Sequence, residues 1–254
     1  MSLGDRAGFG MAALGAFSIP GPKVERDDAP AERPASASAF LAGIDATLDA
    51  SGALWWSATR TLVVSDLHLE TGSSYARTGQ MLPPYDSAMT LARLAEVIGY
   101  YLPRRIVFLG DSFHDPFGAE RLDGDDRATL GALCRAAEVI WITGNHDHDS
   151  AATFGGVACE ATTLDGIAFR HIPTEGVPTG LEIAGHLHPA ARIVVRGRRI
   201  KRRAFVGCPQ RLVMPAFGCL TGGLPVTDPA FAPLWPAPTA PEVHMIGANR
   251  VYSL

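Results

Sequence analysis

The sequence predicts a layered α/β fold in which two mixed β-sheets pack face to face and are flanked by helices, a four-layer αββα sandwich. Between residues 105 and 143, an apolar run, a helical segment and a second apolar run follow one another. This order predicts parallel strands joined by a right-handed crossover. After residue 150 the helical periodicity gives way to short strands separated by Gly and Pro, which predicts a second, more antiparallel sheet.

The composition is that of an enzyme-sized globular chain. Of 254 residues, 47% are hydrophobic and 19% are charged, which argues against disorder and against a coiled coil. The net charge of −4 provides no global positive field for nucleic acid, so any polyanion site must be local. Four scattered cysteines without a CxxC pair fit a reducing compartment. We expect a cytoplasmic protein without a membrane span.

The first fifth of the chain differs from the rest. Residues 1–50 are rich in Pro, Ala and Ser, so we expect a disordered or loosely docked extension. Its last part, residues 40–50, has apolar residues near helical spacing and is expected to dock as a short helix or to lead into the first strand. A single domain is expected over residues 51–254. It begins with a predicted hairpin of residues 54–56 and 61–64. An amphipathic helix is expected over residues 86–101.

The next segments predict the strands and helix of the crossover unit. Residues 105–109 and 139–143 have the apolar character of buried strands, and residues 130–137 between them are helical in pattern. The short strands of the second sheet are expected near residues 167–170, 181–184, 192–195, 200–206 and 211–213.

Four polar motifs follow apolar runs, at strand ends where layered α/β folds place their functional sites. They are Ser65-Asp66-Leu67-His68, Gly110-Asp111, Gly144-Asn145-His146-Asp147 and Gly185-His186-Leu187-His188. In an extended segment the outer residues of Asp-x-His or His-x-His share a face and can bind one ion together. A carboxylate such as that of Asp111 can bridge two cations. Singly, each motif is explained as well by a solvated turn or a core histidine, and only the combination indicates a metal centre.

In this order the four motifs resemble those of the calcineurin-like metallophosphoesterases. The resemblance implies one metal site formed by Asp66, His68, Asp111 and His188. It implies a second site formed by Asp111, Asn145, His186 and one further histidine, which we assign to His171. Two divalent ions are therefore expected. Imidazole suits zinc, manganese and iron better than magnesium or calcium, and the family resemblance implies manganese, with iron or zinc as alternatives.

The expected reaction follows from the charge of the two ions. They would lower the pKa of a bridging water, which falls from 15.7 to about 7 at a single zinc ion, so that hydroxide attacks phosphorus in line. His146, held by Asp147, would protonate the departing alkoxide as general acid. His114, in the loop after the second motif, is a candidate for substrate contact. His148 and His244 are interpreted as surface residues.

A longer series of segments resembles the bacterial ligase-associated DNA damage response metallophosphoesterases, also called endonucleases. These segments are Ser73-Ser74-Tyr75-Ala76, Leu82-Pro83-Pro84-Tyr85-Asp86 and residues 141–147, 182–189 and 211–218. The resemblance implies phosphodiester cleavage in DNA and work beside an ATP-dependent DNA ligase, a nuclease and a helicase. It does not cover residues 1–50.

A basic stretch over residues 192–203 contains seven of the 22 Lys and Arg residues. Such a concentration suits backbone phosphates, although a hairpin with a solvated basic face would have the same composition. The candidate phosphate contacts are Arg196, Arg198, Arg199 and Arg202. Two other functions remain open: a phosphatase or pyrophosphatase acting on a nucleotide or nucleotide-linked metabolite, and a non-catalytic binding module of a repair complex.

Overall fold

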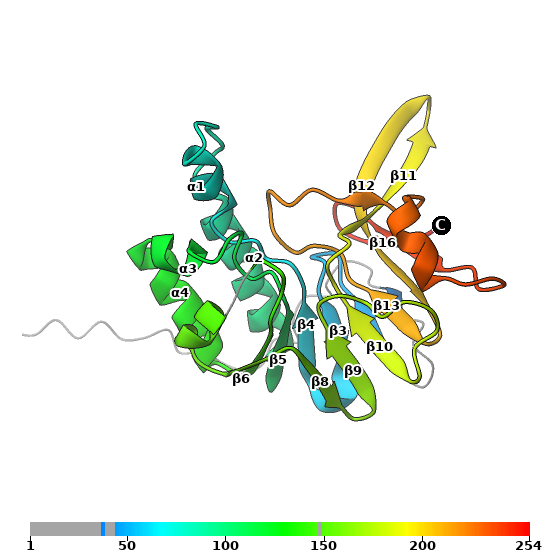
Figure 1. Cartoon of the computed structure of the whole chain (residues 1–254), viewed down its shortest axis with the longest axis horizontal. Coiled ribbons are helices and arrows are strands. Elements are labelled where there is room, and N and C mark those ends of the chain that lie inside the picture. The colour runs from blue at the N-terminus through cyan, green and yellow to red at the C-terminus, as the bar shows by residue number, and fades with distance from the viewer. Residues whose placement is uncertain (1–36, 39–43, 147–148) are drawn as a thin grey trace, which may run out of the picture. The chain divides into compact units, whose positions relative to one another are not determined.

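Two mixed β-sheets dominate the computed structural model, which describes residues 37–38, 44–146 and 149–254 (Figure 1). In the first sheet, strands β1 to β4 pair antiparallel, whereas β4 to β7 run parallel. Its strands, in spatial order, are β1 (Ala37–Ser38), β2 (Ala46–Leu48), β3 (Leu54–Trp56), β4 (Thr61–Val64), β5 (Arg105–Leu109), β6 (Glu138–Ile142) and β7 (Val157–Cys159).

The second sheet has the spatial order β14-β11-β12-β13-β10-β9-β8, and β15 and β16 extend it from β12. Strand β10 runs parallel to both β9 and β13, whereas the long hairpin β11–β12 is antiparallel. The strands are β8 (Ala161–Leu164), β9 (Ile167–Arg170), β10 (Leu181–Ala184), β11 (Pro189–Val195), β12 (Arg198–Cys208), β13 (Arg211–Val213), β14 (Leu224–Pro225), β15 (Glu242–Ile246) and β16 (Val251–Ser253).

In the part of the chain that the structure describes, four α-helices lie on one side of the first sheet (Figure 1). They are α1 (Thr71–Ala76), α2 (Asp86–Tyr101), α3 (Gly118–Arg121) and α4 (Gly124–Arg135). Helix α2 has the predicted bounds. Helix α4 begins earlier than the sequence pattern predicts, because the Asp123 carboxylate caps it by accepting a hydrogen bond from the backbone N–H of Asp126. The short 3₁₀ segments are η1 (Ser57–Thr59), η2 (Asp149–Phe154) and η3 (Pro229–Leu234).

The hydrophobic core forms two main clusters, one on each face of the first sheet. Alternate residues of a strand point to opposite faces, so Val64 of β4 packs in the cluster that includes Leu94 of α2. Its neighbour Val63 packs in the other cluster, with Phe169 and Ile183 of the second sheet. The two sheets therefore pack face to face, as predicted. On the outer side of the second sheet, η3 packs against β13 through Phe231.

Two further expectations differ from the structure. Residues 46–48, within the predicted loose extension, are strand β2, and Leu48 is fully buried opposite Leu54. Three residues are too few for composition to reveal a strand, whereas pairing with β3 defines it. His244, interpreted as a surface residue, lies buried on β15, where it pairs with Phe205 of β12. No helix within the described residues is both long and apolar enough to span a membrane.

Candidate metal centre

The predicted ligands come from loops that follow parallel strands of both sheets. Strands β4, β5 and β6 run parallel, and so do β9 and β10, so each set delivers its carboxyl ends to one edge of its sheet. The face-to-face packing brings the two edges together. The residues delivered are Asp66 and His68 after β4, Asp111 after β5, Asn145 after β6, His171 after β9, and His186 and His188 after β10.

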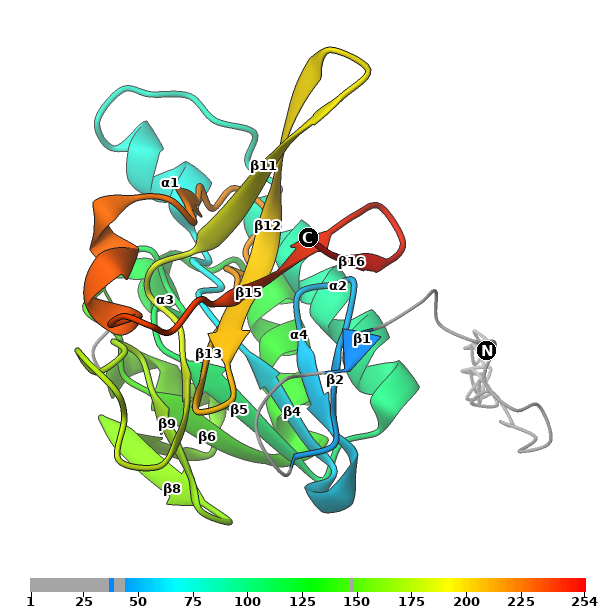
Figure 2. The same cartoon turned by 90° about the vertical axis from the view of Figure 1, so that its right-hand side faces the viewer.

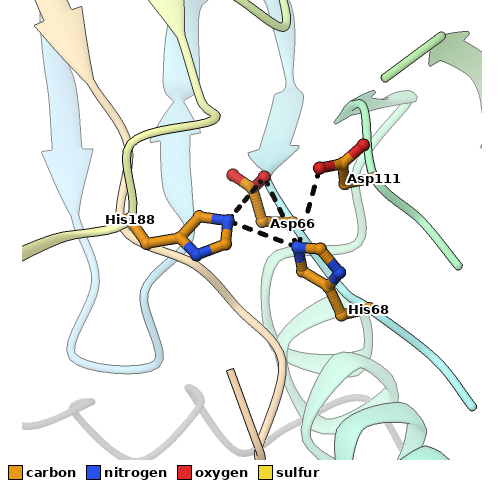
Figure 3. Close-up of side chains that lie close together, drawn as sticks. All are labelled: Asp66, His68, Asp111 and His188. Carbon is orange, nitrogen blue, oxygen red and sulfur yellow. Dashed lines mark hydrogen bonds and ion pairs between the residues drawn. The ribbon is translucent and has the colours of Figure 1, made fainter. Parts of the chain in front are cut away.

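The first group of donor atoms is that of Asp66, His68, Asp111 and His188, whose ligand atoms all lie within 4.8 Å of one another (Figure 3). His188 Nε2 is 3.0 Å from Asp66 Oδ1 and 3.3 Å from His68 Nε2. His68 Nε2 lies 3.7 Å from Asp111 Oδ2. Both carboxylates are buried. The structure thus brings together the four residues predicted for one site.

The second group contains Asp111 again, with His171 and His186. His171 Nε2 is 3.3 Å from Asp111 Oδ2 and 3.2 Å from His186 Nδ1. The side-chain oxygen of Asn145 lies 3.0 Å from the same His171 nitrogen. The second set of predicted residues, including the histidine assigned to complete it, is therefore also together.

These spacings fit metal coordination. Ligand atoms bound at about 2.0–2.2 Å to one tetrahedral or octahedral ion are about 3–3.5 Å apart. Asp111 Oδ2 faces His68 of the first group at 3.7 Å and His171 of the second at 3.3 Å, as a single bridging oxygen would. Asp66 Oδ1 is buried among the histidine nitrogens without a hydrogen bond of acceptable geometry. A bound cation would satisfy it.

The other oxygen of each carboxylate is held by the protein. Asp66 Oδ2 accepts hydrogen bonds from the Ser65 hydroxyl and from the backbone N–H of His186. Asp111 Oδ1 accepts one from the backbone N–H of His146 at 2.9 Å. These bonds turn Oδ1 of Asp66 and Oδ2 of Asp111 toward the histidines. Such support orients metal ligands before an ion binds.

The tautomer of His171 is fixed in the same way. Its Nδ1–H donates to the carbonyl oxygen of Leu109 at 2.8 Å, which leaves Nε2 facing the second group. In metal sites a backbone carbonyl commonly orients a histidine ligand through this second nitrogen. The carbonyl belongs to the last residue of β5, so the sheet itself sets the ring orientation.

The charges within the two donor groups counteract the effect of burial on their pKa values. Burial alone would raise the pKa of Asp66, but the neighbouring His188 and His171 lower it by more, so that it lies below its usual range. Burial likewise raises the pKa of Asp111, while His171 contributes most to lowering it to about 2. Burial lowers the pKa of His68 to about 4. It would lower that of His171 too, but Asp111 and Asp66 raise it to about 9.

The two donor groups together are called the metal cluster below, and its backbone has an unusual conformation. Asp66, His68, Asp111, His186 and His188 all have φ between 44° and 72°, the left-handed region that non-glycine residues rarely occupy. The sequence pattern predicts that Asp-x-His and His-x-His continue as extended strand. Instead β4 and β10 end before these motifs. The left-handed residues turn the chain, and these turns, not the alternation of an extended strand, bring the side chains together.

Glycines make room for this arrangement. A Cβ at Gly144 would collide with the side chain of Asp111, and one at Gly185 would collide with the side chains of Ser65 and Asp66. The glycines in the motifs therefore allow two loops to approach a metal-site carboxylate closely.

His146 lies beside the cluster and is exposed. Its ring is 5.4 Å from that of His68, centroid to centroid. Its Nδ1–H donates to the carbonyl oxygen of His114 at 3.0 Å, so a backbone carbonyl orients the ring. Asp147, predicted to hold His146, lies outside the described residues. His114 is also near the site, with its ring 5.6 Å from that of His68.

Arg121 was missed from the sequence. Its guanidinium makes a bidentate ion pair with Asp115, at 2.9 and 2.7 Å, and its Nε–H donates to the Ser73 hydroxyl. It thereby ties the loop that carries His114 to helix α1. The arginine lies on α3, and nothing in its local sequence links it to either partner.

A second supporting pair was also missed. Arg93 of α2 and Arg203 of β12 both donate to the carbonyl oxygen of Phe217. The backbone N–H of the next residue, Gly218, donates in turn to the carbonyl of Asp66. Arg203 belongs to the basic stretch, yet its guanidinium is built into the fold. The sequence signal for this contact was that Phe217 and Gly218 lie in segment 211–218, one of the segments that resemble the ligase-associated family.

The remaining basic residues lie on hairpin β11–β12, which extends beyond the rest of its sheet (Figure 2). Arg196 occupies the turn, and strand alternation places Arg198 and Arg202 on one face. The opposite face carries Arg199 together with Arg192 and Lys201. Lys201 donates to the carbonyl oxygen of Gly223. The four predicted phosphate contacts are exposed, but they do not form one patch.

This fold and this donor set resemble those of the calcineurin-like metallophosphoesterases, and they support a metal-dependent phosphoesterase. It is similar in particular to a solved structure described as the nuclease MPE of Pseudomonas putida. The two share 28% sequence identity with a TM-score of 0.66, and the match covers 86% of this chain and 100% of that one.

Two other solved structures are more distant. A protein of unknown function from Aquifex aeolicus, AQ665, is 17% identical with a TM-score of 0.37, over 50% of this chain and 78% of that one. The phosphoesterase Yfce of E. coli is 12% identical with a TM-score of 0.39, over 76% and 97%. No family model and no curated protein sequence matches the chain.

Proposed function

We propose that the chain hydrolyses phosphodiester bonds in DNA with two divalent metal ions. The observation that carries this proposal is Asp111 Oδ2, which faces a donor group on each side at 3.7 and 3.3 Å. A carboxylate shared by two groups is the arrangement of two-metal hydrolases, whose ions are about 3.5–4 Å apart. Two such ions would supply a hydroxide nucleophile at neutral pH and neutralise the charge of the phosphate.

The protein's own residues then have distinct roles. Asp66, His68 and His188 would hold one ion, and Asn145, His171 and His186 the other, with Asp111 shared.

His146 is proposed as the general acid that protonates the leaving oxygen. The His114 carbonyl holds its Nδ1–H, so the proton would leave from Nε2. This support comes from a backbone group, and Asp147 is proposed as a further partner on the basis of its sequence position alone.

The donor set favours manganese, iron or zinc. Imidazole nitrogens mixed with carboxylate and amide oxygens suit these borderline ions, whereas magnesium and calcium prefer oxygen alone. We propose manganese, which the family resemblance implies. Metal analysis of the purified protein and reconstitution of the stripped protein with each ion would test it.

Two observations support DNA as the substrate. The solved structure with 28% identity is described as a nuclease, and the arginine-bearing hairpin β11–β12 offers exposed positive charge in a chain of net charge −4. We further propose that the enzyme works in the cytoplasm with an ATP-dependent DNA ligase, a nuclease and a helicase, as the resemblance implies. The described cysteines are free thiols, which is compatible with a reducing compartment.

The test is metal reconstitution followed by a panel of DNA, cyclic nucleotide, mononucleotide and pyrophosphate substrates. We expect metal-dependent cleavage of DNA, and a loss of at least about 10³-fold in Asp111→Asn, because one change removes a charge shared by both ions. Preference for mononucleotides or pyrophosphate would favour the phosphatase alternative. Absence of turnover in metal-loaded protein that still binds DNA would favour a binding module.

A further inference from the structure

A cavity of about 420 Å³ opens beside the first donor group. Its walls include His68 and His188, which belong to that group, and His146, the proposed general acid. A phosphate ester bound at the metal ions would therefore have one of its two substituents directed into this space. Cavities that hold small organic ligands run from about 300 to 1,000 Å³, so the space suits a group the size of a nucleoside.

Apart from its four histidines, the lining of this cavity is uncharged and consists of one tyrosine, two leucines, two threonines and a glycine. Tyr75 of α1 is 38% exposed, and its ring lies 5.5 Å from that of His114 at an interplanar angle of 40°. Leu82 and Leu220 contribute apolar surface. None of the described residues that line it is Asp, Glu, Lys or Arg. The cavity therefore lacks the fixed cations that a second phosphate group would require, whereas a flat uncharged ring can stack there.

The cavity beside the second donor group is different. It measures about 290 Å³ and is lined by Asn145 and His171 together with two charged residues, Glu160 and Arg170. The two sides of the metal centre thus offer different chemistry, since one carries Tyr75 and no Asp, Glu, Lys or Arg, whereas the other carries Glu160 and Arg170. An ester whose two substituents differ would be held in one direction.

We infer that the cavity beside the first donor group binds the base of a nucleotide adjoining the scissile phosphate, with the ring of Tyr75 as its stacking surface. This inference rests on the proposed function and adds to it a specificity-determining residue. Base stacking on aromatic side chains tolerates every base, because each has a π-face. The cavity would therefore favour nucleic acid over simple diesters without selecting a sequence.

The experiment compares three substrates with the manganese-loaded full chain: dithymidine monophosphate and its two analogues in which one base or the other is replaced by hydrogen. We expect one analogue to lose about 5- to 150-fold in kcat/KM, the range that stacking on an aromatic residue produces. On the complete dinucleotide, Tyr75→Ala should lower kcat/KM by the same factor. On the analogue that lacks the stacked base, the same variant should lower kcat/KM no further. Tyr75→Phe, which keeps the ring, should retain activity.

The matched control is Tyr252→Ala, since Tyr252 is 44% exposed on β16 and lies outside this cavity. Equal losses by Tyr75→Ala on all three substrates, or no loss on any, would overturn the base-binding inference alone. Failure of the metal-loaded wild type to hydrolyse any of the three would overturn the phosphodiesterase function and the inference with it. Thermal unfolding of each variant separates a folding defect from either result.

Discussion

The metal cluster and the hairpin β11–β12 are both dense in polar and charged side chains, yet they are built in opposite ways. In the cluster, His188 and His68 are 120 positions apart and their nitrogens are 3.3 Å apart. In the hairpin, Arg198 and Arg199 are neighbours in sequence and lie on opposite faces. The cluster is defined by backbone geometry and burial, whereas the hairpin offers only exposed charge. Proximity in sequence is thus a poor guide to a shared site.

Replacing His146 by Ala tests whether the chemistry of the cluster can be separated from its metal binding. We expect kcat on DNA to fall about 10²- to 10⁴-fold, the usual contribution of a general acid, with both ions retained. His146 contributes no donor atom to either group. Steady-state kinetics together with metal analysis would measure the two effects. Parallel loss of metal and turnover would identify His146 as a ligand.

Gly185→Ala tests whether the cluster depends on its backbone as strongly as on its ligands. The added Cβ would displace the side chains of Ser65 and Asp66, although no ligand is removed. We expect metal affinity to weaken about 10- to 100-fold, as it does when support for a ligand is disturbed. Calorimetric titration with Mn²⁺ would measure it.

The matched control for this change is Gly180→Ala. A Cβ at Gly180 has no atom within 4 Å, so metal affinity should stay as in the wild type. A similar loss in both variants would show that added bulk, rather than crowding at Asp66, explains the effect.

The pH dependence of metal binding tests the charges inside the cluster. Without metal, the pKa of His171 is raised to about 9, so the ring carries a proton at neutral pH that an ion must displace. Affinity for Mn²⁺ should therefore rise about tenfold per pH unit and level off above about 9. His68, with its pKa lowered to about 4, contributes nothing in this range. A flat affinity between about pH 7 and 9 would contradict this assignment.

The same shift predicts the stability of the metal-free protein. Protonated His171 is stabilised in the folded state, since its pKa there is raised above the ordinary value of 6.5. This contribution is complete below about pH 6.5 and disappears as the pH rises through about 9. Thermal unfolding of the EDTA-treated protein across this range should show it, and His171→Gln should remove it.

The smallest effects are expected on the hairpin. Changing Arg192, Arg199 and Lys201 to Gln should weaken DNA binding and reduce the slope of log affinity against log salt by about 1 per lost phosphate contact. Changing Arg198 and Arg202 on the other face should weaken DNA binding less. The reason is that Lys201 contacts Gly223, so the face with Arg192, Arg199 and Lys201 lies toward the loop that borders the metal centre. Equal effects from both faces, or none, would remove this distinction.

Much of this structure was predictable from the sequence, for physical reasons. Helix α2 and strand β5 have periodic or continuous apolar patterns, and their predicted bounds agree with those observed. The residues of the two donor groups were named from the family resemblance of motifs that follow strands, and the structure brings these residues together. The left-handed turns at Asp66 and His188 were not predictable, since a motif names side chains and leaves φ undefined.

Long-range support was also beyond the sequence. Arg121 of α3 donates to Ser73 of α1, 48 positions away, and Arg93 reaches a carbonyl on a segment 124 positions away. No local pattern connects such residues, because their contacts are created only when the sheets and helices pack.

The five left-handed residues at the cluster have a consequence for the chain in its cell. Such a conformation costs on the order of 1–3 kcal/mol at each non-glycine residue, so together these positions cost about as much as the 5–15 kcal/mol by which a typical domain is stable. Bound ions, which stabilise only the folded form, would offset this cost. Scarcity of metal would then lower the abundance of the protein through proteolysis, and not only its turnover.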